Sequence, residues 1–359
     1  MNVQASPKTS RVPTSAVLGF IVDAMQKSGV PVDDAGKIAE LMLEADLIGA
    51  DAHGIFRLPQ YVQRLKLGST NARPNIKVTR SAPATALVDG DNGMGHLVVS
   101  RAMETAIDIA RENGVGWVGM RMSNHAGAAG VYAALALKAG MIGMYAAVAN
   151  ANHMPLAGGA EPLLGTNPLA IAIPAGQEPP LVLDIATSIV SYGTIKNHRL
   201  QNIPLHGDWM VDPKTGEAVT DPQQSAHALL LPMGGYKGAG LALMIGMLAG
   251  VLNGALFGRE CVDFNADPEK VNNTGQFVLA LDPARFRPLD KFKAEVDRHS
   301  RELRASKALP GQSVRLPGDE RAKRRADRLA NGLALAPELL TQLDRLAAEL
   351  AIKPLAARA

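Results

Sequence analysis

A short run near residue 50 combines a proton carrier with a carboxylate-binding group. The run reads DAHGIFR over residues 51–57 and ends an apolar segment with helical patterning. His53 can donate or accept a proton near neutral pH, because an unperturbed imidazole has a pKa of about 6.5. Arg57 presents a planar guanidinium that can hold a carboxylate through two hydrogen bonds. If a new helical turn begins at Gly54, both side chains project to one side. Such a pair suits a 2-hydroxy or 2-oxo acid, although His/Arg pairs at this spacing also arise by chance.

A second candidate site is the run SNHAG, which follows a predicted strand and opens a predicted helix. Exposed amides at a helix N-terminus, together with Ser123 and Asn124, form a natural anion site. The same two residues fit equally well as helix caps. His125 fits equally well as a satisfied core histidine.

Three later segments carry further candidates. The run GTNP at 165–168 is a tight turn before a strand, and ordinary turn chemistry also explains it. Asp184 ends an apolar strand, where a carboxylate is costly unless hydrogen-bonded, so it either orients another group or caps the next segment. Lys237 follows two glycines at a predicted helix start. A cation there opposes the helix dipole, which favours a bound phosphate or carboxylate over a solvated lysine.

One glycine pattern is misleading. Residues 114–119 match the spacing of the dinucleotide-binding fingerprint, but that motif has physical meaning only between a strand and a following helix. Here a helix leads in and a strand leaves. The region about 20 residues later also offers no acid for a ribose. We therefore interpret these glycines as a helix-to-strand turn.

The elements that must position these residues follow from apolar periodicity. We expect two helices over 14–50, a short one over about 56–65, and others at 97–113 and 126–138. We expect strands within 76–90 and at 115–120, 141–148, 169–173, 181–185, 229–231 and 277–281, with charged helices after about 290. Strands bracketed by helices at both ends indicate an α+β protein, not a Rossmann fold. The predicted domains are a helical one, 1–75 plus 285–359, and a β-rich cofactor-binding and catalytic one, 76–284.

Composition excludes several classes of protein. The 359 residues are 47% hydrophobic and 20% charged, with a net charge of +3, so a sizeable core is expected and a nucleic-acid partner is not. The basic residues at 321–325 are better explained as a solvated helix face. One cysteine, Cys261, fits a reducing compartment and a packed thiol. Residues 1–13 lack the apolar core of a secretory signal.

The uncharged run 238–258 is long enough to span a bilayer. Its small residues recur every fourth position, which lets another backbone approach one helix face. We therefore predict a buried helix of a soluble, cytoplasmic protein and no membrane partner.

Taken together, the motifs resemble the malate/L-lactate dehydrogenase family of non-Rossmann NAD(P)-dependent oxidoreductases. The order DAHGIFRLPQY, SNHAG, GTNP, LDIATS, GGYKGAGLALM and RLPGDE is similar throughout, from about Leu41 to Leu333. The resemblance implies a homodimer whose mostly antiparallel β domain binds NAD or NADP. It implies hydride transfer at C2 of a small 2-hydroxy or 2-oxo acid, with a cyclic imino acid or ureidoglycolate as alternative substrates.

Residue roles implied by the resemblance can be stated position by position. His53 would be the proton donor and His125 a second proton-transfer candidate, with Asp184 in the catalytic set. Arg57 and Tyr61 would bind the substrate. The cofactor would contact Ser123, Asn124, His125, Gly127, Thr166, Asp184, Ile185, Ala186, Lys237, Gly238, Pro317, Gly318 and Glu320.

The chain departs from the family pattern at one position, and two other classes of protein fit some of the same residues. Many relatives have serine where this chain has Ala52, so the resemblance does not extend to the proton relay assigned to that serine in imine reductases. A metal-dependent hydrolase using His53, His125, His153 and Asp184 is a rival, but no HxH or HExxH spacing occurs and no metal is expected. A non-catalytic binding protein is the other rival.

Overall fold

The computed structural model describes residues 11–358, which form two compact units. Of these residues, 11–68 and 319–358 belong to unit 1, and 69–318 form unit 2. Most of the 1–13 segment, for which no secretory signal is expected, lies outside the described residues. Each unit has its own hydrophobic core, and they are described separately.

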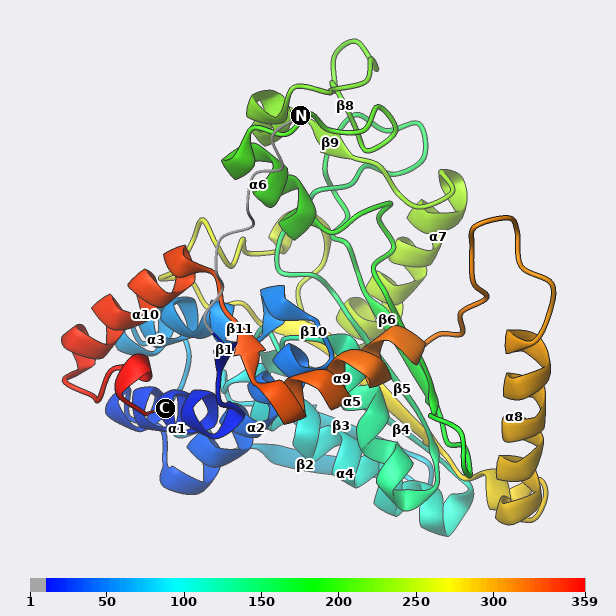
Figure 1. The fold of residues 1–359 in the computed structure, drawn as a ribbon. Helices are drawn as coiled ribbons and strands as arrows, with labels where there is room; N and C mark the ends of the chain where they lie inside the picture. The colour runs from blue at the N-terminus through cyan, green and yellow to red at the C-terminus, as the bar shows by residue number, and fades with distance from the viewer. Residues whose placement is uncertain (1–10, 359) are drawn as a thin grey trace. The chain divides into compact units, whose positions relative to one another are not determined.

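Unit 1 is helical and joins both ends of the chain. Its strands β1 and β11 pair antiparallel, so Arg11 lies opposite Ala334 (Figure 1). The core is formed mainly by apolar side chains of α1 and α2, including Phe20, Ile21 and Met42, all fully buried. The elements are β1 (Arg11–Val12), α1 (Thr14–Lys27), α2 (Val32–Leu47), η1 (Asp51–His53), η2 (Ile55–Arg57), α3 (Leu58–Lys66), α9 (Asp319–Asn331), β11 (Leu333–Ala334), α10 (Pro337–Leu350) and η9 (Leu355–Arg358).

Unit 2 is built on a seven-stranded sheet in the order β2-β3-β4-β10-β5-β6-β7. Every neighbouring pair is antiparallel except β3 and β4, so the predicted mostly antiparallel sheet is confirmed. The strands are β2 (Lys77–Ala82), β3 (Thr85–Asp89), β4 (Val115–Ser123), β5 (Ile142–Ala147), β6 (Leu169–Ile173), β7 (Leu181–Ile185) and β10 (Thr274–Leu281). A separate pair is formed by β8 (Met210–Val211) and β9 (Leu229–Leu230).

Helices cover both faces of this sheet. Helices α4 and α5 lie on one face, and two glycines of the sheet let them approach closely. A Cβ on Gly116 would lie 2.3 Å from the carbonyl oxygen of Ala106 in α4, and one on Gly143 would lie 2.1 Å from that of Ala133 in α5. On the other face Ile245 and Ala249 pack against Ala146 and Phe277. The helices of unit 2 are α4 (Gly95–Asn113), α5 (Ala129–Leu135), η3 (Ala136–Ala139), α6 (Tyr192–Gln201), η4 (Pro222–His227), α7 (Tyr236–Ile245), η5 (Gly246–Gly250), η6 (Val251–Asn253), η7 (Gly258–Glu260), η8 (Pro283–Arg285) and α8 (Leu289–Arg304).

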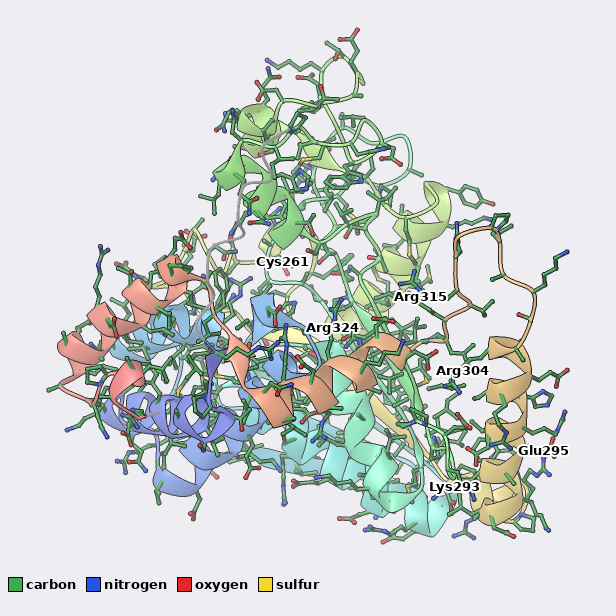
Figure 2. All side chains as sticks on the ribbon, in the orientation of Figure 1. Cys261, Lys293, Glu295, Arg304, Arg315 and Arg324 are labelled. Atoms are coloured by element: carbon green, nitrogen blue, oxygen red, sulfur yellow. The ribbon has the colours of Figure 1, made fainter. Side chains whose placement is uncertain are left out.

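Helix α8 belongs to unit 2, whereas the sequence boundary at residue 285 assigned it to the helical domain. The physical reason is Asp297, whose carboxylate accepts the backbone N–H groups of Gly176, Gln177 and Glu178 at 2.9, 2.8 and 3.1 Å. Arg304 adds an ion pair to Glu178 at 2.6 Å. Figure 2 shows Lys293, Glu295 and Arg304 along this helix. The link between α8 and the β6–β7 connection is not local, so apolar periodicity does not reveal it.

The uncharged run predicted as one helix is divided into three parts. The α-helical turns end at Ile245, residues 246–250 form a π-helix, and residues 251–253 a 3-10 turn. By length and composition Tyr236–Asn253 could cross a membrane, and 44% of this window is buried within the structure. The predicted close approach of another backbone is confirmed at Gly250, which lies against Gly275 of β10. A Cβ on Gly275 would be only 2.6 Å from the Cα of Gly250.

The misleading glycine pattern is resolved as predicted. Gly114 ends α4 in the left-handed conformation, with φ of 84°, and β4 begins at the next residue. The helix-to-strand turn is therefore confirmed. The α-helix α6 was not predicted, because it buries only Ile195 and so carries no apolar periodicity.

Candidate active site

In unit 1 the DAHGIFR run forms two short turns. His53 ends η1, Gly54 separates the turns, and Arg57 ends η2. The two side chains therefore do not share one continuous helical turn. Instead, the Arg57 side chain folds back, and its Nε donates to the carbonyl of Ala52 at 2.9 Å. This bond brings the guanidinium to the residue that precedes His53.

The Arg57 guanidinium is held in place by hydrogen bonds within the protein. Its Nη1 donates to Oε1 of Gln60 at 2.7 Å. Burial lowers the pKa of Arg57, while the nearby Tyr61 opposes this effect. Burial also raises the pKa of Tyr61, so its phenol stays protonated. The arrangement offers an oriented, partly desolvated cation, the kind of group that binds a carboxylate strongly.

In unit 2 the SNHAG segment is fixed by its asparagine. Asn124 is buried, and its Nδ2 donates to the carbonyls of Asn92 and Gly93 at 3.0 and 2.9 Å. Ser123 is also buried. His125 remains half-exposed and lies against Phe264, with ring centroids 5.3 Å apart. Helix α5 begins only at Ala129, and no side chain at its N-cap position caps it, so neither Ser123 nor Asn124 is its cap. His125 is only partly buried, unlike a core histidine.

Asp184 connects β7 to this segment. Its Oδ2 accepts the backbone N–H of Gly130 in the first turn of α5, at 2.9 Å. The carboxylate therefore caps α5, the helix that follows SNHAG, and not the segment after Asp184. This contact joins the end of β7 to the helix that follows His125.

Thr187 joins three of the motif segments. Its N–H donates to the carbonyl of Thr166 in GTNP at 3.0 Å, and its carbonyl accepts the N–H of Met233 at 2.9 Å. In the same turn, Asn167 is buried and donates to the carbonyl of Ala242 in α7 at 2.8 Å. The structure thus brings LDIATS, GTNP and GGYKGAG together, and Asp184 adds the segment after SNHAG.

The start of α7 is shaped by glycine. Gly234 and Gly235 have φ of 59° and 63°, and a Cβ on either would meet no close neighbour outside Lys237. A Cβ on Gly238, in contrast, would lie 2.7 Å from the carbonyl oxygen of Thr187. The exposed Lys237 therefore stands at an open turn that is packed tightly against the Thr187 segment on its inner side.

The late RLPGDE run spans the boundary between the units. The Pro317 carbonyl accepts the N–H of Val182 in β7 at 3.0 Å, and Gly318 has φ of 105°. Glu320 lies in α9 of unit 1, where it pairs with Lys323 at 3.3 Å. Pro317 and Gly318 are therefore the residues of this run that lie against β7.

The residues present fit a polar cofactor. The Thr187 hydroxyl is buried, and within residues 11–358 it has no hydrogen-bond partner. Buried polar groups normally have partners, so an unsatisfied hydroxyl where motif segments meet is suited to a ligand. Lys237 and the open turn before it add a cation and exposed backbone, which a phosphate group requires.

Other chemistry has less support. Within residues 11–358, no group of three or more histidine, cysteine or acidic side chains is placed to hold a metal ion. His153 of the hydrolase rival stacks on Tyr192, and burial is the main cause that lowers its pKa to about 4. Burial raises the pKa of Cys261 to about 11, which keeps it a thiol.

Two residues of interest were missed from the sequence. Asp46 lies beneath the His53–Arg57 turns, and a signal existed: Ile38, Met42 and Asp46 fall four apart, so the carboxylate lies on the buried face of α2. Thr187 had no such signal beyond membership of LDIATS.

Known proteins similar to this chain are dehydrogenases. The sequence model of the malate/L-lactate dehydrogenase family matches residues 12–344. L-sulfolactate dehydrogenase of Methanocaldococcus jannaschii is 38% identical over 333 residues, which cover 93% of this chain and 95% of the relative. Ureidoglycolate dehydrogenase (NAD(+)) of Escherichia coli K12 is 33% identical and covers 90% and 92%. The structure of malate dehydrogenase from Pyrococcus horikoshii OT3 superposes with a TM-score of 0.89 at 32% identity, covering 98% and 99%.

The chain belongs to the malate/L-lactate dehydrogenase family. It is an oxidoreductase, and the expectation of an NAD(P)-dependent dehydrogenase is confirmed at the level of the family.

Proposed function

We propose that the protein transfers a hydride between NAD or NADP and C2 of a small 2-hydroxy or 2-oxo acid related to malate or sulfolactate. The observation that carries the proposal is the meeting of the motif segments at Thr187, with its buried, unsatisfied hydroxyl. Relatives named as malate, sulfolactate and ureidoglycolate dehydrogenases support the substrate class. The cofactor binds on this antiparallel unit, without a doubly wound parallel sheet.

The cofactor is held by the segments around Thr187. Lys237 and the open turn at Gly234 and Gly235 bind phosphate, and Gly238 keeps that turn close to Thr187. The rest of the binding set consists of Ser123, Asn124, His125, Gly127, Thr166, Asp184, Ile185, Ala186, Pro317, Gly318 and Glu320. When bound, the nicotinamide supplies or accepts the hydride.

The chain's own residues bind the acid and move the proton. Arg57 holds the substrate carboxylate, oriented by Ala52 and Gln60. Tyr61, protonated and buried, supports Arg57. His53 donates a proton to the substrate oxygen during reduction, and help of this kind contributes about 10²–10⁴-fold. His125 is the second proton-transfer candidate, and Asp184 orients its segment through Gly130.

The first test replaces His53 by Ala. We expect turnover to fall by at least about 100-fold, because the general acid is lost, while binding of NADH or NADPH is retained. Turnover is followed by nicotinamide absorbance, and cofactor binding by nicotinamide fluorescence. The matched control is His299→Ala, on the exposed side of α8. Full activity of His53→Ala would refute the assignment.

Substrate and cofactor choice are tested together. A spectrophotometric screen of 2-oxo acids and cyclic imines with both reduced cofactors should give highest turnover with a 2-oxo acid. Ala52 lacks the hydroxyl assigned to imine reduction, so we expect cyclic imines to be poor substrates. Faster turnover of an imine would favour the alternative, and saturable binding without nicotinamide oxidation would favour a binding protein.

We further propose a soluble, cytoplasmic homodimer. Support for the dimer comes from the exposed side of α7–η6, where Met244, Leu248, Val251 and Leu252 are 55%, 41%, 55% and 64% exposed. An uncharged surface of this kind on one side of a helix is typical of an interface with another chain. A second copy of this protein is the occupant we propose.

A further inference from the structure

Asp46 lies directly under the two turns that carry His53 and Arg57. It is the penultimate residue of α2 and is only 3% exposed. Its Oδ2 accepts the backbone N–H of Ile55 at 2.9 Å. Ile55 begins η2, the turn that ends at Arg57, so this single bond fixes where that turn starts.

Gly54 fits this carboxylate closely. A Cβ on Gly54 would lie 1.9 Å from Oδ1 of Asp46, far below any real contact distance. The residue between His53 and Ile55 must therefore be glycine as long as Asp46 occupies its place. The carboxylate and the missing side chain together set the separation of η1 from η2.

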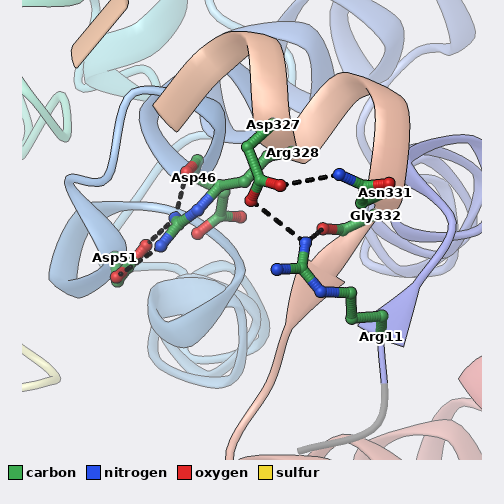
Figure 3. A network of polar contacts seen from close by, with 7 residues as sticks. All are labelled: Arg11, Asp46, Asp51, Asp327, Arg328, Asn331 and Gly332. Atoms are coloured by element: carbon green, nitrogen blue, oxygen red, sulfur yellow. Dashed lines mark hydrogen bonds and ion pairs between the residues drawn. The ribbon is translucent and has the colours of Figure 1, made fainter. Parts of the chain in front are cut away.

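A second clamp holds η1. Arg328 of α9 donates from Nη1 to the backbone carbonyl of Asp46 and to Oδ1 of Asp51. Its Nη2 donates to Oδ2 of Asp51 at 3.2 Å. Figure 3 shows Arg328 reaching both aspartates, while Asp327 of the same helix turns to Arg11 and Asn331. Arg328 thus joins Asp51, the first residue of η1, to the end of α2. Asp46 joins Ile55, the first residue of η2, to the same end of α2.

We propose that Asp46 is a positioning residue for the reaction, whose carboxyl group sets the relative placement of His53 and Arg57 by holding Ile55 beneath the Gly54 break. The proposal rests on the proposed function, because it assigns His53 and Arg57 the roles given above. Asp46 does not touch substrate or cofactor in this account. It acts through the backbone of η2.

The charge state of Asp46 gives the proposal a distinctive signature. Burial raises its pKa to about 8; the Ile55 N–H lowers it, Asp51 raises it and Arg328 lowers it. Near pH 7 the carboxyl is therefore mostly neutral and still accepts from Ile55 through one oxygen. At higher pH the buried anion is relieved by contact with water, which requires the turn to open. Glu44, two residues earlier in α2, pairs with Arg325 of α9 at 2.8 Å.

The test compares Asp46→Asn and Asp46→Ala with the wild type in kcat/KM from pH 6 to pH 9.5. Asparagine is neutral at every pH and keeps an oxygen for Ile55. We expect Asp46→Asn to match the wild type within about threefold at pH 7 and to exceed it several-fold at pH 9.5. Alanine leaves the Ile55 N–H without an acceptor, so we expect kcat/KM to fall by about 30-fold or more, since small misplacements cost up to about 100-fold. NADH and NADPH affinity should not change.

Glu44→Gln is the matched control, because it removes another carboxylate of α2, one that pairs with Arg325 of α9. If Asp46→Ala does not fold, the alkaline profile of Asp46→Asn decides. An unchanged alkaline profile in Asp46→Asn, or full activity in Asp46→Ala, would overturn the inference while His53→Ala is inactive. Full activity of His53→Ala would instead overturn the proposed function and the role of Asp46 with it.

Discussion

The Arg57 guanidinium is oriented by the protein's own acceptors. Its Nε is bound by the carbonyl of Ala52 and its Nη1 by Gln60. A guanidinium fixed in this way loses little further freedom when a carboxylate binds, which is how preorganisation raises affinity. A lysine has a single charged nitrogen on a flexible stem, so it cannot reproduce the fork.

Replacing Arg57 by Lys should therefore act mainly on substrate binding. We expect the apparent KM for the 2-oxo acid to rise about tenfold or more, with a smaller change in kcat and none in cofactor affinity. Lys66→Ala is a suitable control, because it removes an exposed cation at the end of α3 that pairs with Glu349 at 2.5 Å. An unchanged KM in Arg57→Lys would argue that the carboxylate binds elsewhere.

At the level of elements, α8 is attached to unit 2 through one carboxylate. Asp297 is buried and accepts three consecutive backbone N–H groups. Burial raises its pKa, but the donors of Gln177, Glu178 and Gly176 outweigh that effect and leave the pKa below its usual value. The stability from this contact is therefore present above the unfolded pKa of about 4 and lost as pH falls through the folded one.

Asp297→Asn should release the 176–178 loop from α8. An amide offers one oxygen, and its NH₂ group would face a backbone donor, so at least one N–H loses its partner. We expect hydrogen exchange at amides 176–178 to accelerate by about tenfold or more at neutral pH. Glu302→Gln, an exposed change on the same helix, should leave these amides unaffected. Equal protection in both variants would contradict this account.

At the scale of the whole molecule, the uncharged side of α7–η6 makes the assembly testable. Leu248→Asp places a charge in the middle of the proposed dimer contact, and burying it would be costly. Sedimentation velocity should therefore report a dimer for the wild type and a monomer for Leu248→Asp at the same concentration. Leu200→Asp, which changes an 83% exposed leucine of α6, should remain dimeric. A monomeric wild type would exclude the dimer.

The sequence predicted most elements but not their long-range pairing. Apolar runs predicted strands such as 115–120 and 277–281, because the pattern of a buried strand lies within its own residues. Their adjacency was not predictable, since β10 pairs with β4 across more than 150 residues of sequence. Residue types and spacing predicted the main site candidates, such as His53, Arg57 and Asp184, and the resemblance extended the set and assigned roles, which remain predictions. The helical spacing places Asp46 on the buried face of α2, but it does not reveal the partner of its carboxylate, which is the backbone N–H of Ile55.

The central place of β10 bears on how the chain is made. Because β10 lies between β4 and β5, ribosomal synthesis delivers the middle strand after the strands on either side of it. Until residue 281 has emerged, β4 and β5 each expose an unpaired edge, and such edges invite aggregation. Nascent chains stopped near residue 270 should therefore depend on chaperones far more than chains stopped after residue 318.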